Sequence, residues 1–429
     1  MNGVNTEEVK TLNKNTPTKT DFTSASVKTG QPPSDTEALR EMTVGLGPLT
    51  DFIREQYYKT YIAMGGSKIK FITGKPGSGK THFLRLLSAE ALDCGFVTVN
   101  ISARDVWLHD FKEIYAEIFK QCGLMPFIER CAAKITAELG YDHASVPPGR
   151  LFADYLSSIG ELDAITKKEI RNQLREMFIK NPFIDNNFAI ACSLLTGSVL
   201  GHPLLEAENK ELLILWLSGS KDVKLSALRS LGLSPAKITK FNARHMLRSL
   251  LEVLTIAGVP GMSVTVDGLE ALNRATSLDA VRYTKMRRDD VYESIRELID
   301  EIDTLKNIMF FFAFDRVLLD DERAGLKSYQ ALWMRMQNEI VSSAFNKFTD
   351  FYDMDKYAEN MYDSKTLVEM SEKLADMVNR DGSRAEPIDE GLAGALISNA
   401  RHSAVSLPRR VGNATLGYAD GAEVTDDRL

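Results

Sequence analysis

Apolar residues along the 429-residue chain follow two patterns, short continuous runs and longer stretches at helical spacing. The continuous runs are rich in β-branched and aromatic residues, which is typical of buried strands. They predict four strands, at residues 68–73, 96–101, 262–267 and 308–314. Helical patterns separate them, and strands that alternate with helices form parallel sheets with both faces covered. The pattern therefore predicts an α/β fold.

A long stretch inside this α/β pattern contains no convincing strand. Residues 126–235 show only repeated helical spacing, as at 167–179 and 206–217. We interpret this stretch as a helical insertion. The core is then made of two segments of the chain, residues 41–125 and 236–350, and the insertion lies between them in the sequence.

The two ends of the chain differ from the core in composition. Residues 1–35 are rich in Thr, Ser, Asn and Lys, with almost no large apolar residue to offset the entropy of ordering, so we expect a disordered tail. Residues 351–417 again show helical spacing and predict a helical C-terminal region. The polar, acidic residues 418–429 predict a frayed end.

Composition narrows the class of protein. The formal net charge of −7 argues against general nucleic-acid packaging, although a local basic face stays open. The four cysteines have spacings that match neither a disulfide framework nor a zinc site. The longest apolar runs fall short of the roughly 20 residues that cross a bilayer, and the N-terminus has no hydrophobic signal core. We expect a cytoplasmic protein with no membrane partner.

The first predicted strand leads into a glycine-rich turn that ends in Lys-Thr, which we call the P-loop. Glycines let the backbone wrap closely around polyphosphate, so that successive N–H groups point at its oxygens. The lysine adds a mobile cation, and the threonine hydroxyl is suited to Mg²⁺. We predict ATP and Mg²⁺ as cofactors. The residues assigned to nucleotide binding are Gly74, Lys75, Pro76, Gly77, Ser78, Gly79, Lys80, Thr81 and His82.

The third predicted strand closes on an acid, Asp267, in the Walker B pattern. In P-loop NTPases this carboxylate lies beside the P-loop and holds the Mg²⁺ that Thr81 also contacts. We therefore predict that Thr81 and Asp267 share a metal ion. The alternative is an aspartate that simply ends a buried strand.

The fourth predicted strand ends at Asp315-Arg316. Ligands of open α/β sheets bind at the carboxyl edge of the strands, so Asp315 is a candidate sensor of the γ-phosphate. Arg316 is a candidate for reaching the nucleotide of a neighbouring subunit in a homo-oligomer. A solvated arginine is the alternative interpretation of Arg316.

Four basic residues fall at intervals of three and four, which would align them on one face of a helix. They are Lys237, Lys240, Arg244 and Arg248. A basic face can follow the phosphates of DNA, but the same spacing is typical of an ordinary solvated face. Both interpretations stay open.

With both Walker motifs placed, the chain resembles the ATP-binding proteins of BREX phage-exclusion systems, the BrxD-like group of P-loop proteins. The resemblance rests on the segments at 77–87, 266–270 and 288–300, and it covers about residues 45–410. The resemblance implies an ATP-binding component of an antiviral defence complex, which acts near DNA with partner proteins that include a candidate helicase. We interpret the chain as an AAA+-like or STAND-like ATPase with a doubly wound core.

One position departs from the family pattern. The residue directly after the Walker B aspartate is usually Glu, but here it is Gly268, and the nearest substitute is Glu270. We therefore predict a slow ATPase in which Lys80, Asp267, Glu270, Asp315 and Arg316 are the catalytic candidates. Two alternatives are an ATP-binding scaffold that does not hydrolyse ATP, and a DNA-translocating motor or loader of the replication-initiator or transposition type.

Overall fold

A five-stranded parallel sheet lies at the centre of the computed structural model, which describes residues 22–142, 145–274, 279–340, 345–380, 382 and 384–418. Its strand order is β2-β3-β4-β1-β5. The strands are β1 (Ser67–Gly74), β2 (Val97–Ser102), β3 (Met262–Asp267), β4 (Ile308–Asp315) and β5 (Phe351–Asp353). This confirms the α/β prediction with a parallel sheet.

The fifth strand corrects the prediction that the chain is purely helical from residue 351 onward. Residues 351–353 pair with Phe71, Ile72 and Thr73 of β1. A strand of three residues is too short to show an alternating pattern, so only its place beside β1 identifies it.

Side chains of β4 alternate between the two faces of the sheet, as the pleat requires. Phe310, Phe312 and Phe314 belong to one buried core, and Met309 and Phe311 belong to another. The first core includes α6 (Phe111–Cys122), α13 (Ala243–Ile256), α14 (Lys285–Glu301), α15 (Arg316–Asp320) and α16 (Gln330–Ile340). The second includes α3 (Thr36–Met42), α4 (Gly47–Ile53), the π-helix η1 (Arg54–Ile62) and α5 (Lys80–Asp93).

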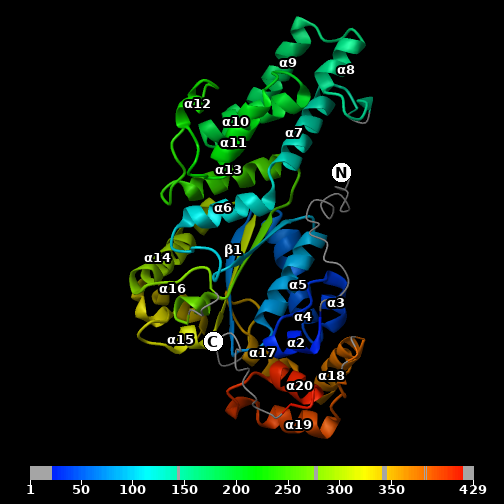
Figure 1. The fold of residues 1–429 in the computed structure, drawn as a ribbon, viewed down its shortest axis with the longest axis vertical. Helices are drawn as coiled ribbons and strands as arrows, with labels where there is room; N and C mark the ends of the chain where they lie inside the picture. The colour runs from blue at the N-terminus through cyan, green and yellow to red at the C-terminus, as the bar shows by residue number, and fades with distance from the viewer. Residues whose placement is uncertain are drawn as a thin grey trace.

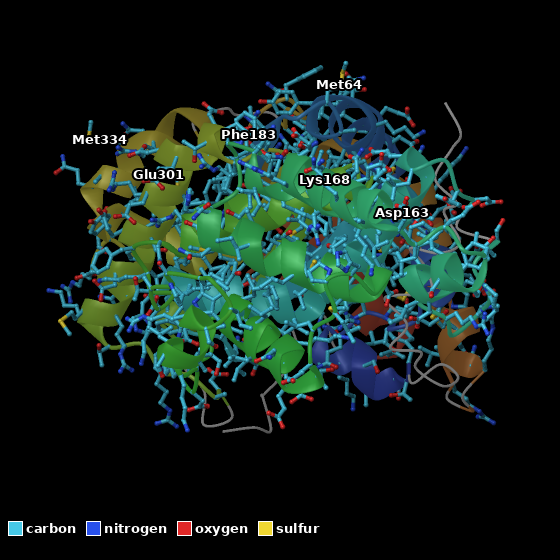
Figure 2. The ribbon with its side chains drawn as sticks, turned by 90° about the horizontal axis from the view of Figure 1, so that it is seen from above. Met64, Asp163, Lys168, Phe183, Glu301 and Met334 are labelled. Carbon is cyan, nitrogen blue, oxygen red and sulfur yellow. The ribbon has the colours of Figure 1, made fainter. Side chains whose placement is uncertain are left out.

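The helices between α6 and α13 continue the first core away from the sheet and form a layer at the top of Figure 1. Helix α10 is central to this layer and packs against α7, α8, α9 and α11. From above, the labelled Asp163 and Lys168 lie on this layer, whereas Glu301 and Met334 lie at its side (Figure 2). Its members are α7 (Met125–Glu138), α8 (Phe152–Ser158), α9 (Ala164–Leu174), η3 (Arg175–Ile179), α10 (Asn186–Leu200), α11 (Ala207–Leu217) and α12 (Leu225–Arg229).

The C-terminal helices lie at the opposite end of the molecule, below the P-loop (Figure 1). They are α17 (Met354–Met361), α18 (Ser364–Asn379), α19 (Glu390–Ser398) and α20 (Leu407–Thr415). None of the helices in the described ranges has both the length and the apolar character needed to cross a membrane.

The tail prediction is wrong for residues 22–35. A short helix, α2 (Ser24–Thr29), lies in this range, and Phe22 is only 5% exposed. Phe22 packs in a cluster with Leu374 and Val378 of α18. The few apolar residues of this segment are enough to order it because they pack on apolar residues of the C-terminal helices. Composition of the segment alone does not reveal that packing. Residues 1–21 and 419–429 lie outside the described residues.

Candidate functional site

The P-loop is the turn between β1 and α5, at the carboxyl edge of the sheet. Gly77 and Gly79 have φ angles of 76° and 85°, in the left-handed region that favours glycine. Ser78, between them, is 4% exposed, and its Oγ has no hydrogen-bond partner within the described part of the chain. A buried hydroxyl in this position can donate a hydrogen bond to a phosphate oxygen, so Ser78 fits a phosphate-binding turn.

The Lys80 ammonium lies within the P-loop. Its Nζ donates to the carbonyl oxygens of Gly74 and Lys75, both at 3.1 Å, and lies 2.5 Å from Oδ1 of Asp315. The alignment of the last residues of β1 and β4, Gly74 beside Asp315, brings this pair together. The structure thus places Asp315 at the predicted edge and in contact with the P-loop lysine.

Thr81 and Asp267 also meet at this edge. The Thr81 hydroxyl donates to Oδ2 of Asp267 at 2.6 Å, which joins the start of α5 to the end of β3. Carboxylate and hydroxyl oxygens are the ligands that Mg²⁺ prefers. These two side chains therefore fit the metal that the sequence analysis assigned to them.

The chain turns sharply after Asp267. Gly268 has a φ of 77°, and a 3₁₀ turn at Leu269–Leu272 follows it at once. This turn folds Glu270 back toward the sheet edge, where its Oε2 is 3.4 Å from the backbone nitrogen of Asp315. The left-handed backbone at Gly268 thus brings Glu270 to the same edge as Asp267 and Asp315.

The Glu270 carboxylate has a cationic partner that the sequence did not indicate. Arg104, in the loop after β2, lies 3.1 Å from Oε1 of Glu270 and 3.0 Å from Oδ1 of Asp279. Burial raises the pKa of Glu270, and the nearby Asp315 carboxylate raises it further. Glu270 is therefore a carboxylate with raised basicity that an arginine holds in place.

Arg316 does not reach this cluster. Its guanidinium makes an ion pair with Asp353, a 6% exposed residue that caps α17. The role predicted for Arg316 at the nucleotide of a neighbouring subunit stays a prediction, and within its own chain this arginine is ion-paired with Asp353. The partner comes from β5, the strand that the sequence analysis missed.

The C-terminal helical region binds the P-loop directly. The Lys75 amide donates to Oδ2 of Asp355 at 2.8 Å, and its Nζ donates to the Ser403 carbonyl oxygen at 2.7 Å. The Ser406 hydroxyl donates to the Pro76 carbonyl oxygen at 3.1 Å. Lys75 and Pro76 thus anchor the start of the P-loop to this region.

Arg409 is a further site residue that the sequence analysis left without a role. A Cβ atom at Gly77 would lie 2.6 Å from Cβ of Arg409, so the arginine packs directly on the P-loop backbone. Its guanidinium donates to the carbonyl oxygens of Val27 and Lys28. The Pro-Arg-Arg sequence at 408–410 shows two arginines after a proline. It does not show that α20 contacts α2 and the P-loop, because that contact depends on the fold.

A cavity of about 200 Å³ lies beside the P-loop, between the N-terminal segment and the C-terminal helices. Its walls are mostly apolar, and P-loop residues 77–82 line one side. An apolar cavity next to a phosphate-binding turn suits a nucleotide base. The other walls include Phe22, Val27, Leu46, Tyr362, Leu374 and Pro408.

His82, the last predicted nucleotide-binding residue, also lines this cavity. Its Nε2 is 2.8 Å from the Thr43 hydroxyl, which donates its own hydrogen to the Leu39 carbonyl oxygen. Nε2 is therefore the donor to Thr43. Desolvation by the surrounding protein lowers the pKa of His82 to about 4, so the ring is neutral at pH 7.

The predicted basic stripe does not lie on one helix. Helix α13 begins at Ala243, so Lys237 and Lys240 precede it. The Asn242 side chain accepts from the Thr239 amide at 2.7 Å and donates to the Lys237 carbonyl oxygen at 3.2 Å, which favours a turn there. Arg244 is ion-paired with Glu297 at 2.7 Å, and Arg248, farther along α13, is partly buried.

Comparison with known proteins identifies a family that matches most of the chain. The family model described as BREX system ATP-binding protein BrxC/D matches residues 24–406. Searches of the curated proteins and of the solved structures found no match. The family match covers both Walker segments, the insertion and most of the C-terminal helices.

Proposed function

We propose that this chain, which belongs to the family of BREX system ATP-binding proteins BrxC/D, is an AAA+-like or STAND-like ATPase that hydrolyses ATP slowly and acts as a nucleotide-controlled switch. The family is an ATP-binding component of a defence system, so the chain acts with other proteins of that system. The contact between Thr81 and Asp267 carries the proposal, because it joins the two Walker motifs into one site.

Phosphate binding falls to the P-loop. The amides around Gly77 and Gly79 and the Lys80 ammonium would hold the β- and γ-phosphates. Thr81 and Asp267 would hold Mg²⁺, which neutralises phosphate charge when it is bound. Lys80 must then exchange part of its contact with Asp315 for a phosphate oxygen, so Asp315 is placed to respond to the γ-phosphate.

Hydrolysis needs a base that orients the attacking water and accepts its proton. Glu270 is the candidate, because the turn at Gly268 brings it to the edge that holds Asp267 and Asp315. Its ion pair with Arg104 stabilises the ionised carboxylate and must loosen before Glu270 can orient a water. We therefore expect turnover well below the roughly 10 s⁻¹ typical of enzymes.

The Arg104–Glu270 pair also favours a second candidate function, an ATP-binding scaffold without hydrolysis. If the ion pair persists when ATP binds, the Glu270 carboxylate is not free to act as base. Single-turnover hydrolysis separates the two functions: a slow rate that depends on Glu270 supports the ATPase, and no phosphate release supports the scaffold.

The Mg²⁺ dependence of ATP binding tests the shared site. In Asp267→Asn the metal loses its anionic ligand, so affinity measured with Mg²⁺ should fall about tenfold or more, toward the value measured in EDTA. Asp154→Asn, which removes an exposed carboxylate on α8, is the matched control and should behave as the parent. If Asp267→Asn keeps the parental Mg²⁺ dependence, Asp267 is only the end of a buried strand.

A further inference from the structure

The segment between α11 and α13, residues 218–242, has a charge opposite to that of the whole chain. It contains five basic residues and one acid, Asp222, in a protein with a net charge of −7. All five basic side chains are exposed: Lys221, Lys224, Arg229, Lys237 and Lys240. A local excess of cations on an acidic protein indicates an anionic partner rather than general solubility.

The fold brings the two ends of this segment together. The Trp216 indole donates to the Ala236 carbonyl oxygen at 3.0 Å, and a Cβ at Gly219 would be 3.8 Å from Cβ of Ile238. Lys221 and Lys237 therefore belong to adjacent stretches of chain. Figure 1 shows α12 and its flanking loops at the edge of the molecule, away from α18–α20.

Phe241 lies beside these lysines and is 88% exposed. The Lys240 ammonium is 5.3 Å from the centre of its ring. A phenylalanine this exposed contributes little to the core, and the ring face opposite Lys240 is open to a planar ligand. An open aromatic face flanked by cations is the combination that binds unpaired bases and their phosphates.

The surrounding acids do not neutralise this surface. Glu113 is 3.8 Å from the ammonium groups of both Lys112 and Lys221, which is a loose contact. Within the described part of the chain, no carboxylate forms an ion pair with Lys237 or Lys240. Arg244, by contrast, is ion-paired with Glu297 and does not belong to the surface.

We propose that Lys221, Lys237, Lys240 and Phe241 form a binding surface for single-stranded nucleic acid. The lysines contact consecutive phosphates, and an unpaired base stacks on Phe241. A duplex keeps its bases stacked on one another, so it gains the phosphate contacts but not the aromatic contact. This surface is separate from the ATP site and does not depend on the function proposed for that site.

Fluorescence anisotropy on the full chain tests the proposal, with a labelled oligothymidine of about 20 nucleotides and a duplex of equal length as probes. Lys237→Glu/Lys240→Glu should lower the slope of log K against log salt for the single strand by about 1.4, at about 0.7 for each phosphate contact. The control Lys168→Glu/Lys365→Glu makes the same charge change at exposed positions elsewhere and should leave the slope as in the parent.

Phe241→Ala distinguishes the single strand from other polyanions. It should weaken oligothymidine binding about fivefold or more and leave duplex binding unchanged, whereas Phe348→Ala, at another exposed phenylalanine, should change neither. Equal loss with both probes, or no loss, would overturn the single-strand assignment. If the parent binds neither probe at low salt, the proposal is wrong. All four variants change exposed side chains, and a thermal unfolding midpoint like that of the parent would confirm that they fold.

Discussion

The guanidinium of Arg104 lies 3.1 Å from the carboxylate of Glu270, although the two residues are 166 positions apart in the chain. Arg104 follows β2 and Glu270 follows β3, and these strands are neighbours in the sheet. The same arginine also donates to Oδ1 of Asp279 at 3.0 Å. Arg104 is therefore placed to hold the candidate base in one position.

Removing this arginine should speed hydrolysis. Without the ion pair, the Glu270 carboxylate is a stronger base and is free to turn toward the water. In Arg104→Gln we expect the single-turnover rate to rise by up to about tenfold, because the released carboxylate can orient the attacking water. Arg335→Gln, which breaks an ion pair with Asp300 at the surface, is the control and should leave the rate unchanged. A fall in rate as large as that in Glu270→Gln would show instead that Arg104 positions the base productively.

The base itself can be tested at two positions. Glu270→Gln should keep ATP affinity and lower the hydrolysis rate about 100-fold, the lower limit for a general base. Because the pKa of Glu270 is raised, the parental rate should begin to fall at a higher pH than for an ordinary carboxylate, as protonation removes the base. A Glu270→Gln protein as active as the parent would exclude Glu270.

Gly268→Glu places an acid directly after Asp267, as in the family pattern. The left-handed backbone at this position should lower the free energy of unfolding by about 1 kcal/mol when the residue has a side chain. A Cβ there would make only ordinary van der Waals contacts, the nearest at 3.5 Å from Arg104 Nε. Gly268→Asn, whose side chain tolerates the left-handed region, is the control for strain. We expect Gly268→Glu to hydrolyse ATP faster than Gly268→Asn. Equal rates would show that the missing acid does not limit turnover.

His82 should make the protein less stable in acid. Its folded pKa of about 4 lies below the unfolded value of 6.5, so the unfolded chain takes up the proton first as the pH falls. The free energy of unfolding should drop by at most about 1.4 kcal/mol for each pH unit from 6.5 to 4. His82→Gln, which keeps an N–H donor but cannot titrate, removes this loss. Urea denaturation at several pH values measures it, and a constant difference between parent and variant would contradict the assignment.

The sequence predicted those site residues whose positions follow from the P-loop and Walker B motifs and from the parallel sheet. A P-loop and a Walker B strand in one parallel sheet must present their ends at the same edge, so Lys80, Thr81, Asp267 and Asp315 could be assigned from spacing alone. The structure brings all four together.

The residues that were missed depend on contacts that no local pattern encodes. Arg104 meets Glu270 only because Gly268 adopts a left-handed turn, and Arg316 finds Asp353 only because three residues form an edge strand. Phe22 is ordered by helices more than 300 residues later in the chain. The spacing of Lys237 and Lys240 looked helical, but the hydrogen bonds of Asn242 form a turn there.

The central claim is that the P-loop binds ATP through Lys80, and calorimetry tests it most directly. Lys80 Nζ is the cation held at the mouth of this turn, so Lys80→Ala should abolish measurable ATP binding. The substitution also leaves Asp315 without its ion-pair partner, so thermal unfolding is needed to check that the variant is folded. The control Lys168→Ala should bind ATP as the parent does. Folded Lys80→Ala protein with the parental affinity for ATP would contradict the account.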